Sequence, residues 1–171
     1  MIGTRSMTAD AITVVTLSAW LGAAILVAAV VAPAAFAVLP SRTLAGALVG
    51  RVLPVLFYGG ALIGLVVALL ARGTMPSVAR VVAGAMMTVT CLAAQLLVAP
   101  RIERIRVDAG RPIDELPPGD SRRAAFGRLH GVSVLLLGAA ALAGGAALVL
   151  TLRTMSHTST NHDLSNTSLE H

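Results

Sequence analysis

Residues 129–152 read LHGVSVLLLGAAALAGGAALVLTL and carry no formal charge when histidine is neutral. A helix needs about 20 mostly apolar residues to cross the hydrocarbon core of a bilayer, so this run is long enough to span one. Three uncharged runs of similar length precede it, at 11–41, 52–71 and 81–100. The sequence therefore predicts four membrane-spanning helices.

The composition supports the same conclusion. Hydrophobic residues make up 56% of the chain, charged residues 12%, and the mean hydropathy is +0.84, which is too apolar for an ordinary soluble domain. Backbone groups inside a bilayer must be hydrogen-bonded within their own segment, which favours helices. We expect an all-α polytopic membrane protein. Its four-transmembrane-helix bundle would occupy residues 1–153, with spans near 11–39, 44–71, 78–99 and 124–152.

The carboxyl-terminal segment, 154–171, is rich in Ser, Thr, Asn and His and lacks apolar periodicity. Such a segment cannot bury enough apolar surface to fold, so we expect a disordered tail. Its last residues, Leu169-Glu170-His171, resemble the start of a vector-encoded histidine tag.

The connection 101–123 is the one long hydrophilic stretch between the spans. It holds six Arg and five acidic residues, which predicts a solvated loop of nearly balanced charge. Pro100 should end the third span, and Pro33 should kink the first. Ser41 and Ser121 are candidate N-caps of the second and fourth helices.

Arginine counts predict the orientation. With four spans, nine arginines lie at one end of the bundle and four at the other. Positive residues accumulate on the cytoplasmic side, so we expect both termini to lie outside a bacterial-type inner membrane. The net charge of +5 comes from helix ends and not from a soluble basic face, which points away from nucleic acid.

Glycines recur at helix-packing intervals. They form Gly46-x3-Gly50 and Gly60-x3-Gly64, and they lie at steps of seven in the last span, at Gly131, Gly138 and Gly145. Small residues let membrane helices approach closely, so these positions predict packing within the bundle. The sequence leaves the formation of a homo-oligomer open.

Several polar and aromatic side chains should lie at a similar depth. At a rise of about 1.5 Å per residue, they fall between about 3 and 13 Å from the cytoplasmic ends of their spans. These residues are Phe36, Tyr58, Cys91, Gln95 and His130. An interfacial aromatic belt or a cavity between the spans would each explain this arrangement.

Met87, Cys91 and Gln95 follow one another at steps of four and should share one helix face. Together with His130, the sulfur atoms would suit Cu(I) or another soft metal. Met and a lone Cys are also common core residues. His130 could alternatively be an axial ligand of haem, or could bond a loop carbonyl.

Other chemistries lack their usual residues. No Asp or Glu occurs between Asp10 and Glu103, which disfavours a conventional proton-coupled pump. The sequence contains no Walker loop and no HExxH, GxSxG or CxxC motif. We therefore lean towards a protein that is not an enzyme.

The stretch Phe126-Gly-Arg-Leu-His-Gly-Val-Ser133 carries a resemblance to a known family. Together with Trp20-x-Gly22, Phe36-Ala-Val-Leu-Pro-Ser-Arg-Thr43 and Gly50-Arg-Val-Leu-Pro54, it resembles the transmembrane protein 205-like family of four-span membrane proteins, a domain of unknown function. The family's asparagine seven residues after the histidine is Leu137 here. The resemblance implies fold-level similarity to copper-resistance D proteins and to four-span haem-binding oxidases. It also implies handling of metals, haem or small molecules, since a eukaryotic member is associated with platinum-drug resistance.

The leading hypothesis is a membrane protein that binds or moves a soft metal ion or a small ligand near the cytoplasmic face. Candidate ligand-binding residues are His130, Tyr58, Gln95, Ser133, Arg51 and Trp20, and candidate metal ligands are His130, Cys91 and Met87. The alternatives are a haem- or quinone-associated redox protein, and a structural membrane partner without a ligand.

Overall fold

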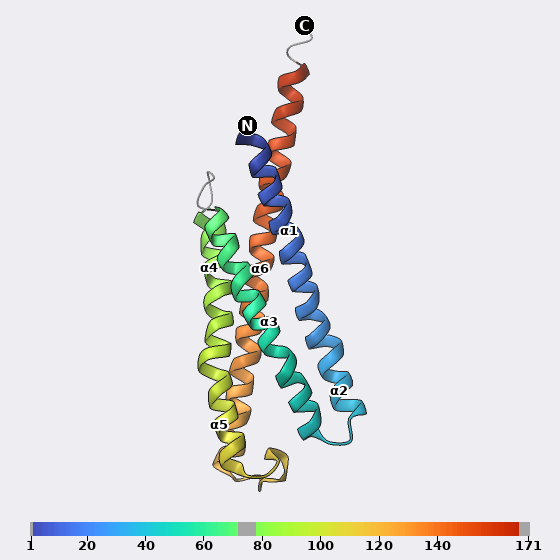
Figure 1. The fold of residues 1–171 in the computed structure, drawn as a ribbon, viewed down its shortest axis with the longest axis vertical. Coiled ribbons are helices and arrows are strands. Elements are labelled where there is room, and N and C mark those ends of the chain that lie inside the picture. Colours follow the sequence, from blue (N-terminus) through green and yellow to red (C-terminus); the bar gives the residue numbers. More distant parts are fainter. Residues whose placement is uncertain (1, 72–77, 168–171) are drawn as a thin grey trace.

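A computed structural model describes residues 2–71 and 78–167, and all regular secondary structure within these ranges is helical (Figure 1). The helices are α1 (Ile2–Leu26), α2 (Ala32–Val38), α3 (Arg42–Ala71), α4 (Val78–Ala93), α5 (Ala99–Ala109) and α6 (Ser121–Thr167). Two π-helical turns, η1 (Val27–Val31) and η2 (Ala94–Val98), join α1 to α2 and α4 to α5, and a 3-10 turn, η3 (Ile113–Glu115), precedes α6.

Four continuous helical stretches are long and apolar enough to cross a membrane. They are Met7–Val38, Arg42–Ala71, Val78–Ala109 and Ser121–Ser156, with mean hydropathies of 2.0 to 2.5. Large apolar side chains such as Val55, Leu135 and Leu142 are exposed on their outer faces. Lipid would cover such faces. The all-α four-transmembrane-helix bundle is confirmed.

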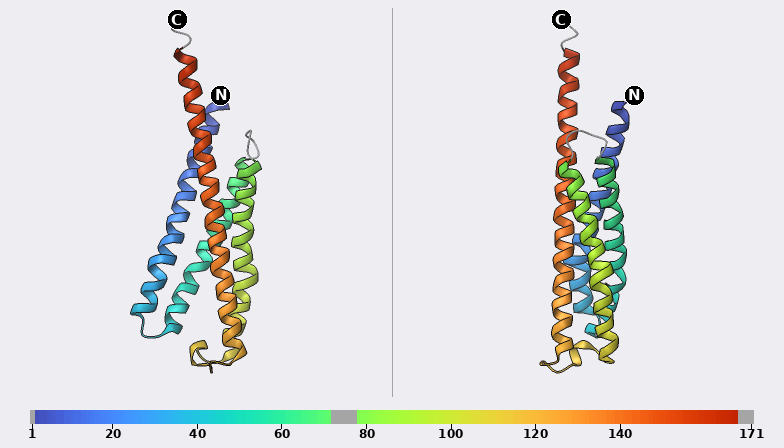
Figure 2. Two further views of the ribbon diagram at one scale, coloured as in Figure 1. Left: turned by 180° about the vertical axis from the view of Figure 1, so that it is seen from behind. Right: turned by 90° about the vertical axis from the view of Figure 1, so that its left-hand side faces the viewer.

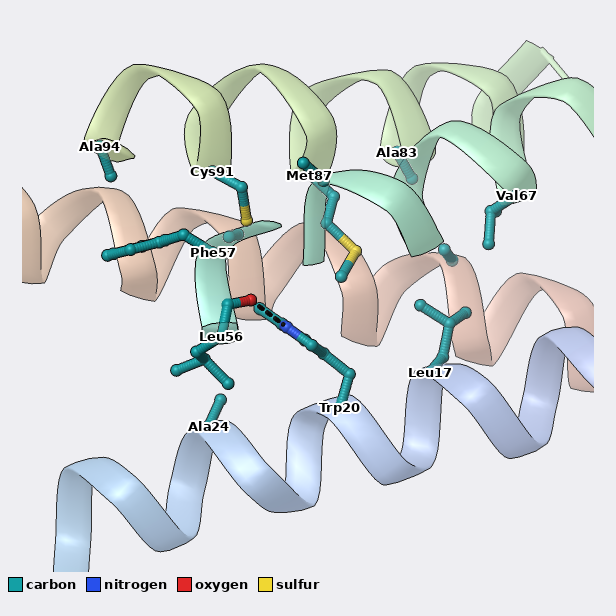
Figure 3. Close-up of a cluster of buried hydrophobic side chains, with 13 residues drawn as sticks. Leu17, Trp20, Ala24, Leu56, Phe57, Val67, Ala83, Met87, Cys91 and Ala94 are labelled. Carbon is teal, nitrogen blue, oxygen red and sulfur yellow. Dashed lines mark hydrogen bonds between the residues drawn. The ribbon is translucent and has the colours of Figure 1, made fainter. Parts of the chain in front are cut away.

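The core lies where α1, α3, α4 and α6 meet (Figure 3). Leu17, Met87 and Cys91 are fully buried there, and Trp20 is 5% exposed. The indole Nε1 of Trp20 donates a hydrogen bond of 2.8 Å to the carbonyl oxygen of Leu56. This bond ties α1 to α3 and satisfies the only polar atom of the indole.

Helices α3 and α4 cross in contact at Gly64 and Gly84. A Cβ atom added to Gly64 would lie 2.7 Å from the carbonyl oxygen of Gly84, and one added to Gly84 would lie 2.6 Å from that of Gly64. The hydroxyl of Thr88 lies within hydrogen-bond distance of two carbonyl oxygens, that of Ala61 across the crossing at 3.2 Å and that of Gly84 in its own helix at 2.9 Å. The packing role predicted for Gly64 is confirmed.

The glycines at steps of seven in α6 behave differently. Among the residues that the structure describes, no atom of another element lies within 4 Å of a Cβ placed on Gly131, Gly138 or Gly145. The prediction that they pack within the bundle is therefore wrong. Helix α6 turns another face inward, where Ala147 and Thr151 are fully buried.

The third helix does not end at Pro100. It continues through this proline as α5 to Ala109, so the first half of the expected 101–123 loop is helical. The π turn η2 ends two residues before Pro100 and departs from α-helical bonding where the proline ring would clash with the preceding turn. Gly110, at φ 62°, ends α5 in the left-handed region that glycine adopts without strain.

Asp120, and not Ser121, caps α6. Its Oδ1 atom accepts a hydrogen bond of 2.8 Å from the backbone N–H of Arg122, and the Arg122 guanidinium pairs with both carboxylate oxygens. Arg123 donates to the carbonyl of the buried Leu116 at 3.0 Å. The 110–120 connection is therefore a compact cap. The predicted cap of α3 is confirmed, since Ser41 Oγ accepts from the N–H of Leu44 at 3.2 Å.

The start of α1 and the end of α6 lie at the same end of the bundle (Figures 1 and 2). Near this end, Arg80 Nη1 of α4 and Asp10 Oδ1 of α1 form an ion pair of 2.9 Å, with side chains 7% and 18% exposed. Helix α6 passes the expected boundary near residue 153 and continues to Thr167, in a stretch without Gly or Pro. The division of the chain into a membrane domain and a tail stays a prediction, and His171 lies outside the described residues.

Candidate functional site

A cleft opens at the opposite end of the bundle, which holds the 39–41 and 110–120 connections and which we call the arginine-rich end. Towards it, α2 and the start of α3 diverge from α5 and α6 (Figure 1 and the left view of Figure 2). The cleft has two parts. Its inner chamber, of about 570 Å³, is lined by α2, α3, η2, α5 and α6.

Three of the predicted ligand-binding residues line the inner chamber. His130 and Ser133 reach it from α6, one helical turn apart, and Gln95 reaches it from η2. Phe36, Phe57 and Phe126 supply aromatic surface around them. The chamber therefore combines an imidazole, a hydroxyl and an amide with apolar walls, as small-molecule sites commonly do.

A stack of three side chains forms one wall of the cleft. The Phe126 and His130 rings are nearly parallel, with centroids 6.3 Å apart and an interplanar angle of 2°. The Arg106 guanidinium carbon lies 5.5 Å from the Phe126 centroid, within the range of a cation–π interaction. The stack places a fixed positive charge beside the aromatic wall.

Arg106 was not among the predicted site residues. Its guanidinium nitrogens lie 3.6 and 3.7 Å from the positions that Cβ atoms on Gly46 and Gly50 would occupy. The Gly46-x3-Gly50 pair thus leaves room for an arginine from α5, and not for the backbone of another helix. The α5 sequence could have indicated this only if residues 101–109 had been recognised as helical.

The outer chamber, of about 630 Å³, continues the cleft towards the arginine-rich end. Both chambers share Phe36, Gly46, Glu103, Arg106 and Phe126. Four arginines and two carboxylates line the outer chamber: Arg42, Arg106, Arg111, Arg123, Glu103 and Asp114. The cleft is therefore apolar and aromatic inside, and polar and positively charged outside.

Cys91, Met87 and Trp20 do not line either chamber. Figure 3 shows them together in the core, where both sulfur-containing side chains are fully buried. The lack of a side chain at Gly60 lets Trp20 and Cys91 pack against α3 here, since a Cβ at this position would lie 2.7 Å from the Trp20 ring and 2.8 Å from Cys91 Sγ. The structure therefore separates the predicted sulfur ligands from the inner chamber that His130 lines.

Tyr58 and Arg51 also lie outside the chamber lining. The Tyr58 side chain is 50% exposed on α3, and Arg51 is exposed one helical turn after Ala47. Their depth matches that of the chamber, but they occupy another side of α3.

The donor atoms around the cleft do not match a soft-metal site. Among the described residues, no group of three or more His, Cys, Asp or Glu side chains could hold a metal ion. The inner chamber offers one imidazole, one amide, one hydroxyl and the Glu103 carboxylate. A soft metal prefers thiolate and thioether ligands, which the chamber lining lacks. A haem iron in the chamber would have one axial imidazole ligand, that of His130.

Comparison with known proteins places most of the transmembrane chain in a family. No curated protein and no solved structure matches the chain. A family model described as domain of unknown function (DUF4149) matches residues 15–111, which include the second half of α1 and all of α2, α3, α4 and α5. The match ends before Phe126, so the resemblance of 126–133 to the transmembrane protein 205-like family stays a prediction. Because the matched residues are more than half of the 171, the protein belongs to the family described as domain of unknown function (DUF4149).

Proposed function

We propose that this multi-pass membrane protein binds a small amphipathic organic molecule in the inner chamber, without converting it chemically. The observation that carries the proposal is the convergence of His130, Gln95 and Ser133 on one aromatic-lined chamber. Gln95 comes from η2, whereas His130 and Ser133 come from α6. Each can donate or accept a hydrogen bond, so together they can orient a ligand held by apolar contacts.

The size and walls of the chamber support an organic ligand. Ligand pockets usually have volumes of about 300–1,000 Å³ and mostly apolar linings with a few polar groups. At about 570 Å³, the inner chamber lies within this range. The Phe126–His130 pair offers a flat surface to a ring or an unsaturated chain.

A soft-metal or haem function has less support from the same geometry. The metal hypothesis needs Cys91 and Met87 near His130, but both are fully buried in the core, apart from the chamber lining. Coupled transport has no added support either, because no Asp or Glu occurs in residues 11–102. Binding is the simplest role that uses the residues present.

A cavity-filling substitution tests the proposal. Ser133→Phe places a ring in the inner chamber, whereas Val134→Phe adds the same ring at the next position, which is 55% exposed. After purification in mild detergent, mass spectrometry should find an organic molecule retained by wild type and by Val134→Phe. Ser133→Phe should retain at least about tenfold less, equivalent to about 1.4 kcal/mol.

Two results would contradict the proposal. One is equal retention by Ser133→Phe and wild type, and the other is a wild-type protein that retains no organic molecule. Elemental analysis and an optical spectrum of the same samples test the alternatives. A stoichiometric metal or a haem band that is lost in His130→Ala would favour them instead.

A further inference from the structure

The outer chamber gathers positive charge from both sides of the cleft. Arg42 begins α3 on one side, while Arg106, Arg111 and Arg123 come from α5 and the segments that follow it. Four guanidinium groups face two carboxylates, so the chamber carries a formal charge of +2. A concave surface of this kind attracts an anion more strongly than a flat surface with the same charge.

Two of these arginines are available to a ligand. Among the described residues, neither Arg42 nor Arg111 has an ion-pair or hydrogen-bond partner for its side chain. Arg106 has a loose partner, since its Nη1 lies 3.7 Å from Glu103 Oε2. Arg123 bonds the Leu116 carbonyl through Nη1 only. The chamber therefore holds many guanidinium N–H donors that no protein acceptor uses.

The two chambers match the two parts of a membrane lipid. The inner chamber is aromatic and apolar, the outer chamber is cationic, and shared residues make them one continuous cleft. Phe36 lines both chambers and is 51% exposed, so apolar surface continues outwards at their junction. The cleft also lies at the end of the spans, where the headgroups of a bilayer would be.

We infer that the cleft holds an anionic phospholipid, with the phosphate among Arg42, Arg106, Arg111 and Arg123 and an acyl chain in the inner chamber. This inference rests on the proposed function and names its ligand class. Guanidinium forks bind phosphate oxygens in pairs, and basic pockets between membrane helices are known to hold anionic headgroups. A zwitterionic lipid fills the same chambers but gains less from the arginines.

The experiment compares two lipids and two pairs of arginine substitutions. Purified protein is mixed with equal amounts of phosphatidylglycerol and phosphatidylcholine, and native mass spectrometry gives the ratio of the bound lipids. Arg42→Gln with Arg111→Gln removes two charges from the outer chamber. Arg101→Gln with Arg104→Gln removes two exposed charges from α5 that line neither chamber, and is the matched control.

Wild type and the control pair should prefer phosphatidylglycerol. In the Arg42/Arg111 double variant, the preference for phosphatidylglycerol should fall about fivefold for each arginine removed, or about twenty-five-fold in total. An equal loss in the control pair, or no preference in wild type, overturns the inference. Displacement of the lipid by millimolar inorganic phosphate also overturns it, because the site would then hold phosphate without needing an acyl chain.

The inference and the proposed function fail in different ways. If Ser133→Phe abolishes ligand retention while the Arg42/Arg111 pair keeps the lipid preference, the inner chamber binds a ligand but the headgroup site is wrong. If the arginine pair loses the preference while Ser133→Phe binds lipid normally, the headgroup site stands and the inner chamber is not the ligand site.

Discussion

Asp120 fixes the start of the last helix through a charged cap. Hydrogen bonds from the side chain and the backbone N–H of Arg122 lower the pKa of its carboxyl from 3.8 to about 2. A pKa lowered by folding means that the cap stabilises the helix start fully above about pH 4, and that this contribution is lost as the pH falls towards 2. Asparagine at this position can still cap the helix but does not titrate.

Hydrogen exchange of the Arg122 amide in detergent tests this prediction. In wild type, protection of this amide relative to the middle of α6 should fall between pH 4 and pH 2. In Asp120→Asn it should stay constant over the same range, and in Asp120→Ala it should be low throughout. A fall of equal size in Asp120→Asn would show that another group is responsible.

Single side chains also show why depth along a helix predicts a site only in part. The rise per residue places His130, Gln95 and Cys91 at similar levels, and two of them do line the inner chamber. Cys91 does not, because a level says nothing about the direction in which a side chain points around its helix axis. Gln95 lies in η2, where the extra residue of the π turn interrupts the face that Met87 and Cys91 share.

At the level of helices, the crossing of α3 and α4 depends on two glycines that meet through their backbones. Gly64→Ala would place a Cβ atom 2.7 Å from the Gly84 carbonyl and 2.8 Å from the Thr88 hydroxyl, so the helices must separate. Overpacking of this kind costs about 1–3 kcal/mol of unfolding free energy. The same change at Gly59, where an added Cβ would have no described residue beyond its own helix turn within 4 Å, should be neutral or stabilise α3 by about 0.5–1 kcal/mol.

Unfolding of the two variants in mixed micelles of mild detergent and dodecyl sulfate measures the difference. Gly64→Ala should unfold at a lower fraction of dodecyl sulfate than wild type, and Gly59→Ala should not. Equal stability of the two variants would mean that α3 and α4 do not rely on this close contact.

The uncharged runs predict the helices well, because hydropathy and length determine which segments can cross a bilayer. They predict the helix ends less well, as Pro100 shows. A proline is expected to stop a helix because it lacks an N–H and its ring clashes with the preceding turn. Here η2 precedes it, the helix continues, and this brings Arg106 of α5 against Gly46 and Gly50. No local pattern in the sequence predicts a π turn at this place.

At the scale of the whole molecule, charge is distributed unevenly between the two ends of the bundle. The arginine-rich end holds nine of the thirteen arginines. At the opposite end, Arg80 is paired with Asp10, so its charge is largely neutralised there. The arginine-rich end has ion pairs as well, between Arg122 and Asp120 and between Arg106 and Glu103. Because the positive-inside rule counts Arg and Lys and not net charge, the nine-to-four arginine count remains the reason to expect that the arginine-rich end faces the cytoplasm.

Labelling of single cysteines in intact cells tests this orientation. In a Cys91→Ala background, Glu115→Cys lies in the exposed 110–120 connection and Ser156→Cys lies exposed near the end of the last span. A membrane-impermeant thiol reagent should label Ser156→Cys in intact cells, and should label Glu115→Cys only after lysis. The opposite pattern would place the cleft in the outer leaflet, where a phospholipid ligand would have to enter from the other side of the membrane.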